Sequence, residues 1–274
     1  MMTIEKGDGT EEKEAIESLS SPSAAEMQTW IEYQDLLRKK LITEDDFPWR
    51  LRVLGEEMSE GVEEQLRFVG GVDVSYVKGQ EQVACGTLVV VDLISLQVVY
   101  SDYCLVTLTV PYVPGFLAFR EAPILIELLE KMKKNGNSFY PQLLMTDGNG
   151  LLHPRGFGLA CHLGVLANLP TIGVGKNLHH VDGLSKQMVI QLLQAEENNG
   201  KCSVTLQGKS GMIWGAAMQS TENSKNPIFV SVGNRISLET SIKIVEMTCK
   251  YRIPEPIRQA DIKSREYLRK HQGP

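Results

Sequence analysis

The first half of the chain shows apolar runs typical of strands, followed by a segment with helical spacing. Runs rich in Val, Ile, Leu and Tyr cover residues 68–77, 83–94 and 96–107 and are joined by short turns. This pattern predicts three antiparallel strands that follow one another in a meander. The segment 117–134 then predicts a helix whose buried face carries Phe119, Ile124, Leu125, Leu128, Leu129 and Met132.

In the second half, strand and helix patterns alternate. The predicted order is a strand closing on Asp147, a helix, a strand, further helix and strand, and two final helices. The segments with defined limits are 142–146, 157–168, 171–174, 237–250 and 255–270. Such alternation indicates parallel β-α-β pairing, and no linker separates the two halves. The sequence therefore predicts one α/β domain, here assigned to residues 26–271.

The N-terminal segment has a different composition. Residues 1–25 are rich in Glu, Ser and Gly and carry six acids against two lysines, a local charge of −4. This composition predicts a disordered acidic tail. Apolar residues at helical spacing then predict an amphipathic helix over residues 26–45, ended by the sequence Asp45-Asp46-Phe47-Pro48.

Composition excludes several classes of protein. The chain has 274 residues, of which 42% are hydrophobic, a proportion typical of soluble globular proteins. No apolar run approaches the roughly eighteen residues of a membrane span, and the N-terminus lacks the pattern of a secretory signal. The five cysteines form no Cys-x-x-Cys pair. We therefore expect a reducing compartment, without a zinc knuckle or a disulfide framework.

The distribution of charge matters more than the net charge of −6. Residues 250–274 carry seven Lys or Arg against three acids, a local charge of +4. A basic final segment permits phosphate binding. It is equally compatible with an ordinary solvated helix face, and charge alone leaves both interpretations open.

One acid, Asp73, lies at the centre of an apolar predicted strand. Burying an isolated carboxylate is costly, so a cation must lie beside it or the side chain must face water. Asp147 ends a later predicted strand, and if the two strands are neighbours, the two carboxylates lie close together. Such acids repel unless protonated or bridged, and Mg²⁺ or Mn²⁺ is the natural bridge. Two such ions about 4 Å apart can support cleavage of a phosphodiester.

Each candidate residue also has an ordinary structural role. Asp73 could be a structural acid next to a turn. Asp147 could be the first residue of an ordinary Asp-Gly turn. Glu121 could be a solvated acid in the first turn of a helix. Taken alone, residues such as Asp261, His153 and Lys176 are more often at surface or structural positions.

Four motifs, taken together, resemble the Endonuclease V family. They are 70–75 (Gly-Gly-Val-Asp-Val-Ser), 111–121 (Pro-Tyr-Val-Pro-Gly-Phe-Leu-Ala-Phe-Arg-Glu), 147–158 with its Asp-Gly-Asn-Gly start, and 252–261 with its Arg-Gln-Ala-Asp end. The resemblance spans about residues 25–270, in the family's order. The second motif is the most specific of the four because of its length.

The resemblance implies an RNase H-like fold with a central five-stranded mixed sheet flanked by helices. It implies an endonuclease that depends on Mg²⁺, for which Mn²⁺ can substitute, and that recognises inosine. Cleavage is expected at the second phosphodiester on the 3′ side of inosine, leaving a 5′-phosphate and a 3′-hydroxyl. The metal-binding carboxylates would be Asp73, Glu121, Asp147 and Asp261, with Lys176 near the scissile phosphate and His153 supporting the site.

The resemblance also implies a set of substrate-binding residues. Tyr112 corresponds to an aromatic wedge that fills the gap left by a base taken out of the stack. Pro111 and Pro114 would fix its loop, and glycines would let backbone approach the flipped base. The remaining residues of this set are Val113, Gly115, Phe116, Leu117, Gly148, Asn149, Gly150, Gly158 and Leu159.

The choice between RNA and DNA rests on one position. Bacterial family members tend to have His where this chain has Asp261, so the resemblance favours the animal-type members, which act on inosine-containing RNA. A deoxyinosine-specific DNA repair endonuclease, an RNase H-like nuclease of different specificity and a non-cleaving inosine-RNA binding protein are the alternatives. We also expect a monomer without a membrane partner, located in the cytoplasm, with the nucleus or nucleolus as a second location.

Overall fold

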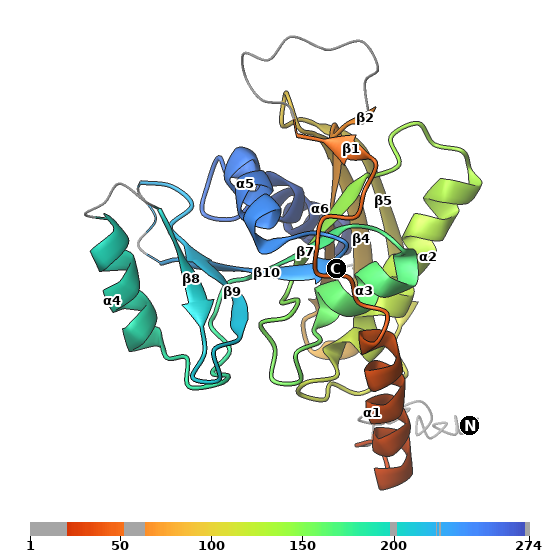
Figure 1. Cartoon of the computed structure of the whole chain (residues 1–274). Helices are drawn as coiled ribbons and strands as arrows, with labels where there is room; N and C mark the ends of the chain where they lie inside the picture. The colour runs from red at the N-terminus through yellow and green to blue at the C-terminus, as the bar shows by residue number, and fades with distance from the viewer. Residues whose placement is uncertain (1–20, 52–63, 198–201, 223, 225, 272–274) are drawn as a thin grey trace, which may run out of the picture.

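A computed structural model describes residues 21–51, 64–197, 202–222, 224 and 226–271. Its main feature is an eight-stranded mixed sheet in the order β5-β4-β3-β6-β7-β10-β9-β8 (Figure 1). The strands of this sheet are β3 (Phe68–Val77), β4 (Gln80–Asp92), β5 (Val98–Thr107), β6 (Leu143–Asp147), β7 (Thr171–Gly175), β8 (Ser203–Gln207), β9 (Ile213–Met218) and β10 (Ile228–Asn234). Two short parallel strands, β1 (Trp49–Arg50) and β2 (Glu64–Gln65), form a separate pair.

Within the large sheet, the first five strands along the chain, β3 to β7, form the arrangement that the sequence predicts. Strands β3, β4 and β5 pair antiparallel, and β6 and β7 run parallel to β3 and to each other. The expectation of five strands in the whole sheet is wrong, because β10 pairs antiparallel with the free edge of β7, and β9 and β8 continue beyond it. All seven residues of β10 are buried, as expected for an internal strand.

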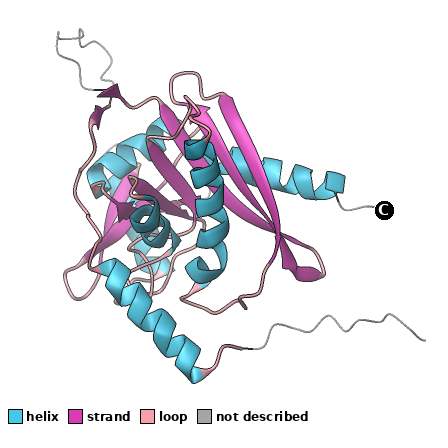
Figure 2. Ribbon diagram, turned by 90° about the vertical axis from the view of Figure 1, so that its right-hand side faces the viewer, coloured by secondary structure: helices cyan, strands magenta, loops and turns pink. Residues whose placement is uncertain are grey.

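Helices cover both faces of the sheet, as Figure 2 shows. Leucines of α2 pack with Leu163 of α3 against one face, whereas Ile244 of α5 and Ile257 of α6 pack against the other. Figure 1 places α4 beside β8 and β9, at the end of the molecule opposite α2. The helices are α1 (Ala24–Arg38), α2 (Leu117–Lys134), α3 (Leu159–Ala167), α4 (Lys186–Glu197), α5 (Leu238–Thr248) and α6 (Glu255–His271). No helix in the described ranges is both long and apolar enough to span a membrane.

Helix α6 lies unusually close to strand β3. A Cβ atom added at Gly71 would lie 2.0 Å from the carbonyl oxygen of Pro256. Only a residue without a side chain allows this contact between the helix backbone and the strand backbone. The contact fixes α6 across the sheet, and α6 carries Asp261.

The N-terminal helix ends earlier than the sequence predicts. It begins after the capping box formed by Ser23 and Glu26 and ends at Arg38, not near residue 45. The chain leaves the helix because Ile42 binds the end of β10: its backbone N–H donates to Asn234 Oδ1 (3.2 Å), and its carbonyl accepts from the N–H of Arg235 (2.7 Å). Residues 1–20 of the predicted acidic tail lie outside the described residues.

Candidate active site

Asp73 and Asp147 lie on adjacent parallel strands. This meets the condition under which the sequence predicts that the two carboxylates lie close together. The last paired residues of β3 and β6 are Val72 and Thr146, so both aspartates follow directly after the same pair. Because successive side chains alternate between the faces of a strand, Asp147 shares the face of Met145, which packs in the same cluster as Ile257 of α6. Both carboxylates therefore lie at the α6 face, at the carboxyl end of β6.

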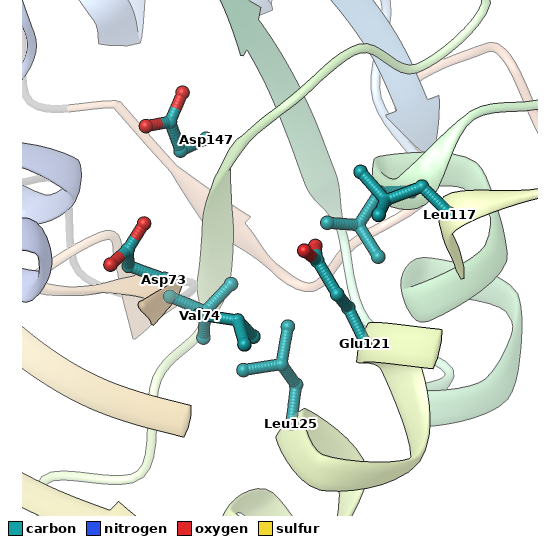
Figure 3. A pocket seen from close by; sticks show the side chains of 8 residues that line it. Asp73, Val74, Leu117, Glu121, Leu125 and Asp147 are labelled. Atoms are coloured by element: carbon teal, nitrogen blue, oxygen red, sulfur yellow. The ribbon is translucent and has the colours of Figure 1, made fainter. Parts of the chain in front are cut away.

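Glu121 reaches the same place from the opposite layer. It lies in the second turn of α2, only 7% exposed, while β3 continues for five residues beyond Val72 without β6 beside it. At this step in the sheet, a pocket of about 240 Å³ is lined by Asp73, Glu121 and Asp147 together with Val72, Val74, Leu117, Leu125 and Leu159. Figure 3 shows Glu121 facing the two aspartates from α2.

Burial and mutual repulsion change the proton affinity of these acids. Burial raises the pKa of Glu121 from 4.5 to about 7, opposed by a hydrogen bond from the hydroxyl of Tyr76 (2.6 Å) and reinforced by Asp73 and Asp147. Burial also raises the pKa of Asp73, and the charges of Asp147 and Asp261 act in the same direction. The site thus holds more negative charge than its surroundings stabilise.

Two serines hold the Asp73 carboxylate in place. Its Oδ2 atom accepts from Ser264 Oγ of α6 (2.8 Å) and from Ser75 Oγ of β3 (3.0 Å), and the two hydroxyls lie 2.6 Å apart. Sequence reasoning missed Ser264 and Tyr76 as partners of the acids. Ser264 follows Asp261 by three residues on the same helix, a spacing that placed it on the same face.

A second, larger hollow of about 830 Å³ lies on the other side of Asp73 and Asp147. Besides these two aspartates it is lined by Ser75, Tyr76, Lys78, Lys176, Asp261, Arg265, Leu268, Arg269 and Val74. Lys176 Nζ forms an ion pair with Asp147, and Arg265 forms one with Asp261 (2.7 Å). Asp261 and Lys176 are therefore brought to the acids, and four cations surround this hollow.

His153 is the one predicted catalytic residue that lines neither hollow. It is 9% exposed, its ring centre lies 5.9 Å from that of His179, and its Nδ1 accepts from the backbone N–H of Arg155 (3.2 Å). Burial, with the charges of His179 and Arg155, lowers the pKa of His153 to about 4. The ring is neutral at pH 7, and its hydrogen bond from the backbone of Arg155 stabilises the segment that follows Asp147.

The predicted substrate-binding residues form two loops beside the smaller pocket. In the first, Tyr112 is 64% exposed, Pro111 and Val113 are half-buried, and Phe116 is buried below them. The loop leads directly to Leu117, which lines the pocket.

The second loop, 148–158, is tied to the sheet by its backbone. The N–H of Gly148 donates to the carbonyl of Val174 (3.2 Å), and that of Gly150 donates to Ser231 Oγ (2.9 Å). A Cβ atom at Gly158 would lie 2.2 Å from the carbonyl oxygen of Asn149, so this close approach requires glycine. The side chain of Asn149 is buried in the loop, and Leu159 lines the pocket.

The donor set suits hard divalent cations. In the part of the chain that the structure describes, no three Asp, Glu, His or Cys side chains are already arranged around a single ion position. The acids are nevertheless all oxygen donors, and burial, reinforced by neighbouring carboxylates, raises the pKa of Asp73 and of Glu121. A divalent ion supplies the missing charge, and oxygen ligands are those that Mg²⁺ and Mn²⁺ prefer.

Comparisons with known proteins point to one family. The family model described as Endonuclease V matches residues 53–262. The chain is 43% identical to human Endonuclease V over 94% of this chain and 89% of the human protein, and 45% identical to the mouse protein over 92% and 72%. The crystal structure of the human catalytic domain superposes with a TM-score of 0.80 at 42% identity, covering 91% of this chain and 98% of that one.

A relative crystallised with nucleic acid superposes on this chain with the same TM-score as the human catalytic domain. Endonuclease V of Ciona intestinalis has been crystallised with a 23mer DNA containing an inosine followed by a ribo-adenosine. It has a TM-score of 0.80 and 35% identity, covering 91% of this chain and 99% of the Ciona chain. This agreement over nearly the whole of both chains confirms the fold that the sequence resemblance implied.

Proposed function

The chain belongs to the Endonuclease V family, and from this premise we propose that it is an endoribonuclease that cleaves RNA containing inosine. The proposed cut is at the second phosphodiester on the 3′ side of inosine, leaving a 5′-phosphate and a 3′-hydroxyl. One observation carries the proposal: the acids stand between a pocket and a hollow lined by cations, and the pocket is lined by Leu117 and Leu159, which directly follow the Tyr112 loop and the 148–158 loop. A nucleic-acid strand laid across the acids can place a phosphate at the acids and turn the flipped base towards the two loops.

Two cation positions would flank the pair Asp73 and Asp147. On the pocket side Glu121 would complete the ligand set, and on the other side Asp261 would do so, since each shares a hollow with both aspartates. The ions would be Mg²⁺, with Mn²⁺ able to substitute. Bound there, divalent ions would supply the positive charge that makes a water molecule nucleophilic and stabilises the leaving oxyanion.

The protein's own residues do the remaining work. Ser264 and Ser75 orient the Asp73 carboxylate through their hydrogen bonds to Oδ2. Lys176, which neutralises Asp147 here, is placed to turn its ammonium group to a phosphate that enters between them. Arg265 and Arg269 add positive charge along α6, where a strand leaving the acids would run.

Selection of inosine follows from the two loops. Tyr112 is exposed enough to insert between bases, and base stacking on an aromatic side chain is worth about 1–3 kcal/mol. The 148–158 loop, which leads to Leu159 of the pocket, would present backbone groups to the edge of the base. Adenine would leave some of those groups unpaired, which costs about 1–3 kcal/mol for each buried group.

Two features favour RNA over DNA. The fourth acid is Asp261, the residue typical of animal-type members, and the Ciona enzyme was crystallised with a ribonucleotide directly after inosine. A 2′-hydroxyl at that position can donate and accept hydrogen bonds that deoxyribose lacks. The rival function is repair of deoxyinosine in DNA. We propose that the protein acts on RNA as a monomer, in the cytoplasm or the nucleus.

The test is a cleavage assay with four strands of one sequence: RNA with inosine, DNA with deoxyinosine, the same DNA with one ribonucleotide 3′ to the lesion, and RNA with adenosine. Each is incubated with Mg²⁺ and with excess chelator. We expect cleavage of the first and third strands only, and only with Mg²⁺. Equal cleavage of the all-DNA strand would favour the repair function.

The Asp73→Asn variant separates cleavage from binding. It should lose cleavage by about 10³-fold or more, because an amide cannot share two cations, while retaining affinity for inosine-containing RNA within a few-fold. Cleavage that persists in this folded variant, or in chelator, would overturn the proposed chemistry.

A further inference from the structure

A buried glutamine on α1 joins the two substrate loops. Gln34 is 1% exposed, although it lies on a helix that otherwise packs at the edge of the molecule. It precedes residues 53–262, the segment that the family model matches. A buried side-chain amide is costly unless its donors and acceptor are all used, so its partners indicate what it does.

The partners of Gln34 come from both loops. Its Nε2 donates to the carbonyl of Phe157 (3.0 Å) and, over a longer distance, to that of Gly115 (3.4 Å). Its Oε1 accepts from Nε of Arg155. Carbonyls can only accept and the Arg155 Nε can only donate, so the two ends of the amide are assigned without ambiguity.

The two carbonyls lie at matching places in the chain. Gly115 precedes Leu117 by two residues, and Phe157 precedes Leu159 by two residues. These leucines are the first residues of α2 and α3, and both line the acid pocket. Gln34 therefore ties together the starts of the two helices that contribute Leu117 and Leu159 to the pocket.

Ring contacts reinforce this junction from both sides. The ring of Trp30, one turn earlier on α1, lies 6.0 Å from that of Phe116, and the Arg155 guanidinium lies 5.2 Å from the Phe116 ring centre. Arg155 also reaches Asp35 (3.3 Å). The loop that carries Tyr112 and the loop 148–158 are thus held to α1, and through it to each other.

We propose that Gln34 is a positioning residue that sets the distance between the Tyr112 loop and the 148–158 loop, and so the fit of the flipped base. The inference rests on the proposed function, because it places that base between the two loops. Gln34 touches neither the base nor the acids. Its loss acts through the loops, and a misplacement of about 1 Å can cost about a hundredfold in rate.

The test compares Gln34→Met with the control Gln28→Met in the full-length protein. Methionine keeps the length of the side chain but removes the strong donors and acceptor. Gln28 lies on the same helix, is exposed, and binds only Glu32 (2.8 Å). We expect Gln34→Met to lower kcat/KM for inosine-containing RNA by about 10- to 100-fold, mainly through KM, and to narrow the preference for inosine over adenosine. Gln28→Met should stay within about twofold of the wild type.

A third variant, Gln34→Glu, dissects the junction. The glutamate keeps an acceptor for Arg155, but its second carboxylate oxygen would face the carbonyl oxygens of Gly115 and Phe157 and be repelled by them. This variant should therefore lose preference for inosine over adenosine, as Gln34→Met does. Thermal melting is recorded for each variant, and kinetics are measured where all are folded. A purely structural role would lower Tm and leave KM and the inosine preference unchanged, and that result would overturn the proposal.

Two further outcomes are distinguishable. If Gln34→Met does not fold, Arg155→Met breaks the same junction from a side chain that is 30% exposed and should raise KM in the same way; an unchanged KM there would overturn the proposal. If the wild type itself shows no preference for inosine, the proposed function fails. A wild-type preference that the Gln34 variants retain refutes only the role of Gln34.

Discussion

The raised pKa of Glu121 makes a quantitative prediction about stability. The carboxyl group is 7% exposed, and its pKa in the folded protein is about 7 against an ordinary value of 4.5. The folded state therefore binds this proton more tightly than the unfolded state. Stability falls as pH rises through the window between 4.5 and about 7, and the full penalty is present above it. This difference in pKa corresponds to about 3 kcal/mol.

The variant Glu121→Gln isolates this contribution. Glutamine has nearly the same shape, its side-chain oxygen can still accept from the hydroxyl of Tyr76, and it does not ionise. In chelator near pH 8, the variant should be more stable than the wild type by up to about 3 kcal/mol. Below about pH 4 this difference should disappear, because the Glu121 carboxyl is then mostly protonated in both the folded and the unfolded state.

Urea unfolding of both proteins across this pH range measures the effect. Taking the difference between them cancels the titrating groups that do not interact with Glu121. Divalent cation should stabilise the wild type more than the variant above pH 7, since only the wild type gains a counter-ion for Glu121. A variant that is no more stable than the wild type near pH 8, with an unchanged m value, would refute the account of Glu121 as a destabilised anion.

Three other substitutions test separate parts of the molecule. Tyr112→Ala should leave Tm unchanged, because the side chain is 64% exposed. It should lower kcat/KM for inosine-containing RNA by a factor equivalent to about 1–3 kcal/mol, the contribution of one base stacked on an aromatic ring. If the variant keeps the wild-type preference for inosine over adenosine in a competition assay, Tyr112 does not act as the wedge. Gly71→Ala should cost several kcal/mol or displace α6, since its Cβ would meet the Pro256 carbonyl at 2.0 Å, and denaturant unfolding with unchanged stability would contradict the close contact. Arg269→Ala should reduce the slope of log affinity against log salt by about 0.7 for a single strand, and an unaltered slope would exclude a phosphate contact.

Much of the fold was predictable because its signals are local. The meander β3-β4-β5, the helix α2 and the strand ending at Asp147 each have an apolar period that matches their structure. The neighbouring positions of Asp73 and Asp147 followed from two such strands pairing in parallel. The sheet's full width did not follow, because nothing local in β10 specifies that it pairs with the edge of β7.

The partners of the acids were not predictable for the same reason. Ser264 lies 191 positions from Asp73 in the chain, and Gln34 lies 123 positions from Phe157. A serine or a glutamine on a helix usually faces solvent, and only tertiary packing turns these two inward. The early end of α1 is a third case, since Ile42 is held by residues at the end of β10.

The difference in length between β3 and β6 explains why acids from both layers can meet. If β6 continued beside β3 past Asp147, its backbone would fill the step where Glu121 now faces Asp73. Instead β6 stops at Asp147, and among the described strands β3 continues to Val77 paired only with β4. The free side of β3 is thereby opened to α2 from one face and to α6 from the other. Because β6 is short, the neighbours of Asp73 are the side chains of other acids and not the backbone of a paired strand. The same gap lets a substrate reach Asp73.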